Sequence, residues 1–209
     1  QSKLISKPQD LTGRGTAAPD PSLGMDEIGL PEDVAWKMYS NFVIRRLVRS
    51  GHSAARAKEL LEERAYPAKQ ALDAELKERP IIYNRAPSLW RYSIVAAYPK
   101  LVKGKTIKVN PLVESGMNLD YDGDALQLHL PATDRGVADA KKMTLSNLLF
   151  SDKARDHLLV FPQHEAIIGI FQATSAKPTG RSFTFKTRGE AWAAYKDGKL
   201  KLGDAVKVG

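Results

Sequence analysis

The feature that most constrains the fold is a change of sequence pattern at Pro80. After this residue come short β-rich runs that Pro and Gly separate at close intervals, as a small barrel requires. The last run alternates between apolar and polar residues after its first position, so we expect it to bury one face. The four runs are 80–84, 93–98, 106–110 and 125–130.

Before Pro80 the sequence predicts three consecutive helices. Pro31 followed by two acidic residues is a helix-start signal, because Pro fits the first turn and acids favour the positive end of the helix dipole. Apolar residues then recur at helical spacing until Gly51. The expected helices are 32–49, a second from a Ser53 cap through Ala65, and a third over 67–79.

The remaining segments complete a predicted α+β fold. Residues 1–30 are expected to be irregular or short strands, and Thr187 and Glu190 have capping-box spacing. Helices are expected over 134–146, 162–174 and 188–197. We therefore expect a barrel domain over residues 1–135, with a helical insertion at about 32–79, and a mainly helical segment over 136–209.

Composition and charge exclude several classes of protein. There is no cysteine and there are only four scattered histidines, which excludes a disulfide scaffold, a thiolate nucleophile and a Cys-ligated metal. No apolar run approaches the ~18 residues of a membrane span, so we expect a cytoplasmic protein and no membrane partner. The net charge of +8 favours a polyanionic partner such as nucleic acid, although a solvated basic surface is an equal alternative on charge alone.

The candidate chemistry lies in three aspartates at alternate positions, Asp120, Asp122 and Asp124. In a strand, neighbours in this set would lie roughly 6.5–7 Å apart on one face, and a turn at Gly123 would bring all three together. No Lys or Arg occurs between Lys108 and Arg135 to balance them, and like charges this close repel unless a cation neutralises them. Hard oxygen ligands of this kind select Mg²⁺, which phosphoryl and nucleotidyl transfer require.

Two other interpretations of the acidic motif are a calcium loop and a turn without a ligand. The calcium loop fails, because its sixth position would be Ala125 rather than Gly and its twelfth Pro131 rather than Glu. A turn without a ligand stays open on spacing alone, because short motifs often match by chance.

Residues 118–124 resemble the NADFDGD signature of the largest catalytic subunit of multisubunit DNA-directed RNA polymerases, called beta-prime in bacteria. Leu119 replaces Ala and Tyr121 replaces Phe, while the aspartates, the Asn and the Gly stand. The similarity covers nearly the whole chain, and several ordered motifs at matching spacing argue against chance. The other similar stretches are Asn84-Arg-Ala-Pro-Ser-Leu-Trp-Arg91, Asn110-Pro-Leu-Val113, His129-Leu-Pro131, and residues 10–31, 162–174 and 190–208.

The resemblance implies a fold and a role for each matching residue. The fold would be a double-psi β-barrel with a helical insertion, followed by the start of a helical pore region. The three aspartates would hold the catalytic Mg²⁺ at the RNA 3′ end, where the ion serves nucleotidyl transfer. The sugar of the incoming nucleotide would meet Arg85 and Asn118, with Pro87 shaping the pocket. Nucleic-acid phosphates would meet Arg14 and Lys7, where Lys7-Pro8 replaces a family lysine-arginine pair and so loses one basic contact.

The implied partners are a DNA template, an RNA transcript, nucleoside triphosphates and other polymerase subunits. These subunits would be the second large beta-type subunit, the remainder of beta-prime and the assembly subunits, so the chain alone should be inactive. Its divergence from the family would suit a viral or plasmid-borne polymerase in a bacterial cell. Since the chain starts at Gln1, it could be an excised domain or a split-gene product. The alternative function is a non-catalytic nucleic-acid-binding or polymerase-assembly module that retains the barrel.

Overall fold

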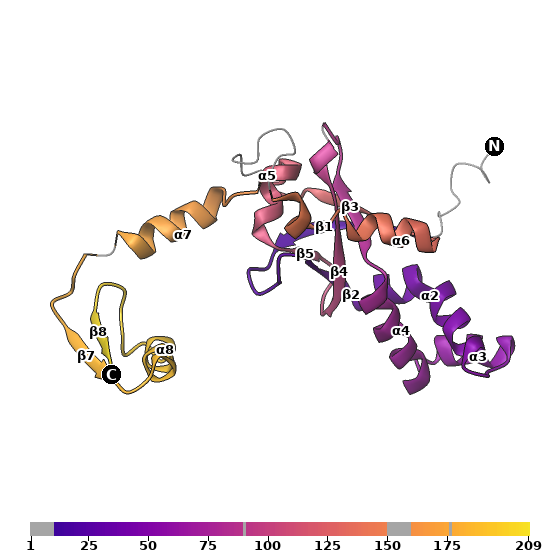
Figure 1. Ribbon diagram of the computed structural model, residues 1–209, viewed down its shortest axis with the longest axis horizontal. Coiled ribbons are helices and arrows are strands. Elements are labelled where there is room, and N and C mark those ends of the chain that lie inside the picture. Colours follow the sequence, from indigo (N-terminus) through magenta and orange to yellow (C-terminus); the bar gives the residue numbers. More distant parts are fainter. Residues whose placement is uncertain (1–10, 90, 150–159, 176) are drawn as a thin grey trace. The chain divides into compact units, whose positions relative to one another are not determined.

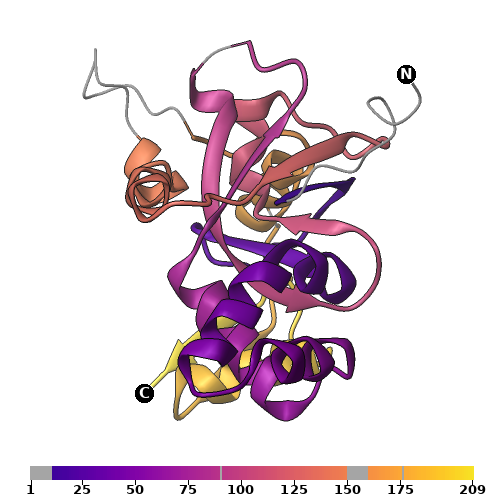
Figure 2. The same ribbon diagram turned by 90° about the vertical axis from the view of Figure 1, so that its right-hand side faces the viewer.

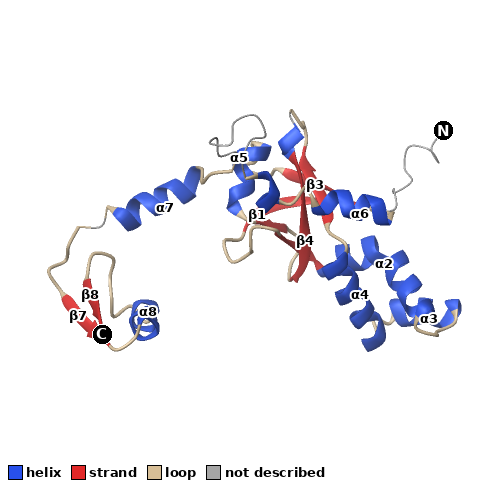
Figure 3. Ribbon diagram, in the orientation of Figure 1, coloured by secondary structure: helices blue, strands red, loops and turns tan. Residues whose placement is uncertain are grey.

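The computed structural model describes residues 11–89, 91–149, 160–175 and 177–209. Contacts divide the chain into two compact units, residues 1–162 and residues 163–209. The first unit combines strands and helices, as Figure 3 shows, so the predicted α+β class is confirmed. The expected division between residues 135 and 136 is a functional assignment and stays a prediction.

Six strands of the first unit pair in the order β1-β5-β2-β4-β3-β6 and close into a barrel (Figure 1). Closure comes from β6, which pairs antiparallel with β3 on one side and with β1 on the other. The pairs β1·β5 and β2·β4 are parallel. The strands are β1 (Thr12–Pro19), β2 (Glu27–Pro31), β3 (Ile81–Arg85), β4 (Ile94–Val102), β5 (Ile107–Val109) and β6 (Ala125–His129). All four predicted β-rich runs are therefore strands.

Strand β1 is longer than the sequence suggested for this region. Gly13 and Gly15 lie inside it. A Cβ at Gly13 would stand 3.0 Å from the Met38 sulfur, and one at Gly15 would stand 2.9 Å from Ile107 Cδ1. These glycines therefore let β1 approach a helix and a neighbouring strand closely, and they do not end the strand.

Alternating side chains of the strands fill the barrel core. In β6, Leu126 and Leu128 are fully buried while His129 is exposed, which confirms the predicted alternation. Apolar residues of the other strands are buried as well, at successive positions in β2 and β4. Those that are at most 1% exposed are Ile28, Leu30, Ile81, Tyr83, Ala96, Ala97, Ile107 and Val109.

The three predicted helices of the insertion are present and lie together at one end of the barrel (Figures 1 and 2). They are α2 (Glu32–Arg49), α3 (Ala54–Glu62) and α4 (Tyr66–Glu78). The predicted Ser53 cap is confirmed, because its side chain accepts a hydrogen bond from the Arg56 amide. Helix α2 buries Tyr39, Phe42 and Val43 against its neighbours.

Two shorter helices flank the last strand, α5 (Glu114–Met117) and α6 (Asp134–Lys141). Helix α6 ends earlier than the predicted 134–146. The Met143 carbonyl accepts a hydrogen bond of 2.9 Å from the Ala96 amide, and Thr144 forms a bridge with Ala96 of β4. Because these residues pair with the sheet, they cannot continue the helix.

The second unit contains α7 (His164–Thr174), β7 (Ser182–Phe185), α8 (Arg188–Lys196) and β8 (Ala205–Val208). The two strands are a parallel pair that the sequence prediction missed, because each is only four residues long. Thr187 caps α8 by accepting from the Glu190 amide, whereas the Glu190 carboxylate accepts from Lys186 instead of Thr187. In the described part of the chain no helix is both long and apolar enough to cross a membrane.

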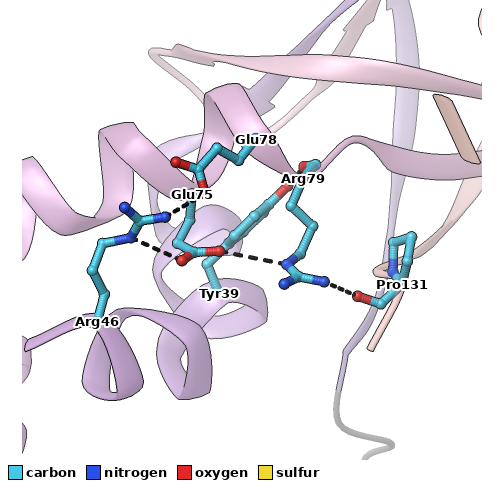
Figure 4. A network of polar contacts seen from close by, with 6 residues as sticks. All are labelled: Tyr39, Arg46, Glu75, Glu78, Arg79 and Pro131. Carbon is cyan, nitrogen blue, oxygen red and sulfur yellow. Dashed lines mark hydrogen bonds and ion pairs between the residues drawn. The ribbon is translucent and has the colours of Figure 1, made fainter. Parts of the chain in front are cut away.

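A buried polar network fastens the helical insertion to the end of β6 (Figure 4). The Arg79 guanidinium donates to the Pro131 carbonyl at 2.7 Å and to Glu75 at 3.4 Å, and it lies 3.9 Å from the centre of the Phe42 ring. Glu75 also accepts from Arg46 at 2.9 Å, and the Tyr39 hydroxyl donates to the Arg79 carbonyl. Arg79 and Glu75 are 9% and 7% exposed, so the network stands largely out of water.

We predict that Arg79→Met lowers the free energy of unfolding by about 2–4 kcal/mol, because it deprives buried oxygens of a charged donor. Urea unfolding followed by circular dichroism measures the change. Arg56→Met is the matched control, since it removes only the exposed Arg56–Glu59 pair and should cost less than about 0.5 kcal/mol. Equal losses in the two variants would show that the buried Arg79 network stabilises the fold no more than an exposed ion pair does.

Candidate active site

The acidic loop, residues 118–124, connects α5 to β6. Asn118 caps α5 in the left-handed conformation, at φ 49° and ψ 47°, which Asn adopts more readily than most residues. Leu119 is 1% exposed and anchors the loop in the barrel core. Asp120 and Asp122 are exposed to solvent. A turn is present at Gly123, and its φ of 125° suits glycine alone, but the turn does not gather the three carboxylates into a group that could hold a metal ion.

Asp124 is the most constrained of the three aspartates. Its Oδ2 accepts hydrogen bonds from the Arg85 Nε and, at 3.0 Å, from the Asp120 amide. Its main-chain carbonyl accepts from the Ala17 amide of β1 at 2.8 Å. Asp124 is therefore tied both to β1 and to the end of β3.

The Arg85–Asp124 ion pair corrects the expectation that no basic side chain balances the trio. Arg85 is far from the loop in sequence, but β3 and β6 pair antiparallel with Arg85 opposite Leu126. This register places Arg85 beside the residue that precedes β6. Charge compensation thus comes from the neighbouring strand, which local sequence could not reveal.

This environment shifts the pKa of Asp124. The hydrogen bond from Arg85 is the main cause, and the Asp120 amide and the positive charge of Arg85 act in the same direction. Partial burial opposes them. The net result is that the pKa of the Asp124 carboxyl lies below its ordinary value, because donors and a nearby cation favour the charged form.

The donor set of the loop fits a hard divalent cation chemically, since it consists of carboxylate oxygens. The arrangement is nevertheless not that of a finished metal site. Within the described ranges, no group of three His, Asp or Glu side chains converges closely enough to hold a metal ion. Asp124 instead uses its Oδ2 to accept from Arg85, so a cation that used all three aspartates would have to share this carboxylate with the arginine or displace it.

The structure describes three of the remaining predicted site residues, and each lies in a different part of the fold. Asn118 belongs to the loop itself, and Pro87 follows a cis peptide bond in the exposed segment after β3. Arg14 is exposed on β1, where it pairs with Gln127, the third residue of β6. Lys7 lies outside the described residues.

A row of polar side chains that the sequence analysis did not propose crosses three strands next to the loop. The sheet register aligns Arg14, Gln127 and Asn84. The Asn84 amide donates to the Ser88 hydroxyl at 2.9 Å and, at 3.5 Å, to the Gln127 side chain. The alternation in β6 marks Gln127 as an outward position, but only the strand order shows which residues stand beside it.

Comparisons with known proteins give a consistent relationship. The family model "RNA polymerase Rpb1, domain 2" matches residues 55–146. A protein named DNA-directed RNA polymerase subunit beta' from Cutibacterium acnes is 36% identical over 98% of this chain. Proteins of the same name are 38% identical over 83% of the chain in Borreliella burgdorferi, and 33% identical over 98% of it in Amoebophilus asiaticus. The chain spans only 16%, 13% and 15% of the lengths of these relatives, respectively.

We predict that Arg85→Gln raises the pKa of Asp124 toward the ordinary ~3.9 of an aspartate. Because the folded-state pKa is lowered, the pair stabilises the fold fully above the unfolded value, and this contribution is lost as pH falls through the folded value. Carboxyl ¹³C NMR titration measures the pKa of Asp124 in the wild type and in Arg85→Gln. Arg14→Gln, which removes a charge from β1 without touching Asp124, should leave the pKa in place. A wild-type pKa at or above the ordinary value would contradict this interpretation of the ion pair.

Proposed function

Because this chain is a relative of one segment of the beta' subunit of DNA-directed RNA polymerase, we propose that its acidic loop belongs to a catalytic centre for RNA synthesis. The reaction is nucleotidyl transfer from nucleoside triphosphates to the RNA 3′ end on a DNA template. The observation that supports the proposal is the contact between Arg85, at the end of β3, and Asp124, the last residue of the acidic loop before β6 in a closed barrel. We assign this barrel to the double-psi class and residues 136–209 to the start of a helical pore region.

Asp120, Asp122 and Asp124 would hold Mg²⁺. Bound there, the ion supplies positive charge that lowers the pKa of the RNA 3′-hydroxyl and stabilises the charge developing on the α-phosphate. The exposure of Asp120 and Asp122 leaves their carboxylates accessible from solvent. Leu119 and the Gly123 turn fix the loop backbone from which these side chains project.

The sugar of the incoming nucleotide is assigned to Arg85 and Asn118. A guanidinium carries several fixed donors, and the ribose 2′-hydroxyl is the group that distinguishes RNA precursors from DNA precursors. Pro87, in the exposed segment that follows Arg85, would shape one side of this pocket. Arg14 and Lys7 would contact nucleic-acid phosphates, which set position and not sequence.

The chain is proposed to act only within a larger assembly. It spans about a sixth or less of its relatives, and substrate binding therefore requires segments that it does not contain. We propose the remainder of beta', the second large beta-type subunit and the assembly subunits as partners, in the cytoplasm of a bacterial cell.

We predict that Asp122→Asn in the assembled complex lowers Mg²⁺-dependent extension of an RNA primer on a DNA template by about a hundredfold or more. This is the usual loss when one group that stabilises a transition state is removed. The complex is recovered by co-expression of the tagged chain with its neighbouring genes, and extension is measured by gel. The matched control is Asp139→Asn, on α6, where the carboxylate is exposed and contacts only Lys142 among the pairs described.

Complex recovery should be equal for wild type and both variants, so that a loss of extension reports chemistry and not assembly. Equal extension by wild type and Asp122→Asn would overturn the catalytic assignment. It would favour the alternative, a nucleic-acid-binding or assembly module that retains the barrel.

A further inference from the structure

One carboxylate oxygen of the acidic loop holds two donors from two different parts of the fold. Asp124 Oδ2 accepts from the Arg85 Nε of β3 and from the Asp120 amide of the loop itself. The Arg85 and Asp124 side chains are 23% and 18% exposed, so the pair is shielded but still in contact with solvent. The ion pair and the loop conformation are thus stabilised by the same oxygen.

The barrel register makes this pairing an intrinsic part of the fold. In the β3–β6 ladder, Tyr83 stands opposite Leu128 and Arg85 opposite Leu126. Asp124 directly precedes β6, two residues before Leu126, at the end of the strand where β3 carries Arg85. The closed barrel therefore brings the two side chains within reach of each other.

A divalent cation and the Arg85 guanidinium compete for Asp124. Both are positive, so each disfavours the other next to one carboxylate. A cation that binds all three aspartates also needs Asp124 oriented toward Asp120 and Asp122. In the present arrangement Asp124 is oriented by Arg85, and the described carboxylates form no ready metal cluster.

We propose that Arg85 is an exchangeable counter-ion: it neutralises Asp124 in the metal-free loop, and metal binding displaces it and frees its guanidinium for the nucleotide sugar. This inference rests on the proposed function. It couples metal binding to sugar recognition. A sugar that binds Arg85 draws it away from Asp124 and so strengthens metal binding, and a bound metal releases Arg85 and so strengthens sugar binding. Arg85 thus acts as a positioning residue toward the metal.

The test measures Mn²⁺ binding to the 209-residue chain by the loss of the free-ion electron paramagnetic resonance signal. Arg85→Gln should bind Mn²⁺ about tenfold more tightly than wild type, because the competing charge is gone. Arg14→Gln is the matched control: it removes the same charge from a β1 side chain for which no contact with Asp124 is described, and it should change affinity by less than about twofold. Asp122→Asn should weaken binding in either background, and circular dichroism confirms that each variant is folded.

A second measurement follows Arg85 directly. The ¹⁵N NMR resonance of its Nε–H, assigned by its absence from Arg85→Gln, should move on Mg²⁺ addition toward the position of a solvent-exposed arginine. The same shift should need more Mg²⁺ in Asp122→Asn. Arg85→Gln that binds Mn²⁺ no more tightly than wild type, or an Nε–H resonance unmoved at saturating Mg²⁺, would overturn the exchange.

The pattern of results separates this inference from the function on which it rests. If Asp122→Asn loses Mn²⁺ binding while Arg85→Gln binds like wild type, the metal site stands and the exchange falls. If wild type and Asp122→Asn bind Mn²⁺ alike, the loop holds no metal and both fail, whatever the Arg85 resonance does.

Discussion

The arrangement of the site depends on the hydrogen bonding of β6 to both β1 and β3. This double pairing closes the sheet, and it also determines what stands beside the acidic loop. The loop enters β6 at Asp124, whose carbonyl is fastened to β1 and whose carboxylate is fastened to β3. Without closure, only hydrogen bonds within the loop itself would orient the aspartates.

Closure also changes the electrostatics that the sequence suggests. Along the chain the acidic loop is far from any Lys or Arg, and repulsion among carboxylates would be expected to dominate. In the barrel the nearest cation comes from the adjacent strand, so Asp124 is paired while Asp120 and Asp122 stay exposed. The loop therefore has one carboxylate in an ion pair and two that are accessible to solvent. The regular spacing in the sequence does not show this difference.

How far the sequence predicts the structure depends on the range of the interactions. Helix α2 and the alternation of β6 follow from local periodicity, and the Ser53 cap follows from a local hydrogen bond, so all three are predictable. Strand β1 is underestimated because Gly13 and Gly15 are explained by contacts with Met38 and Ile107, far along the chain. The early end of α6 and the Arg85–Asp124 pair escape prediction for the same reason, since both are determined by strand partners. The resemblance to a polymerase subunit suggested roles for individual residues, but it did not indicate these partners.

The Arg79 network has a consequence for how such a chain can diverge. Strand β6 carries the acidic loop at one end, and just past its other end the Pro131 carbonyl is held by an arginine from the helical insertion. Substitutions on the outward faces of α3 and α4 leave that hydrogen bond unchanged, so residues on these surfaces can be replaced and can form new contacts. A change at Arg79 or Glu75 would instead alter the support of the strand that presents the aspartates. The position of the acidic loop therefore also depends on residues of the helical insertion, which attach to the opposite end of β6.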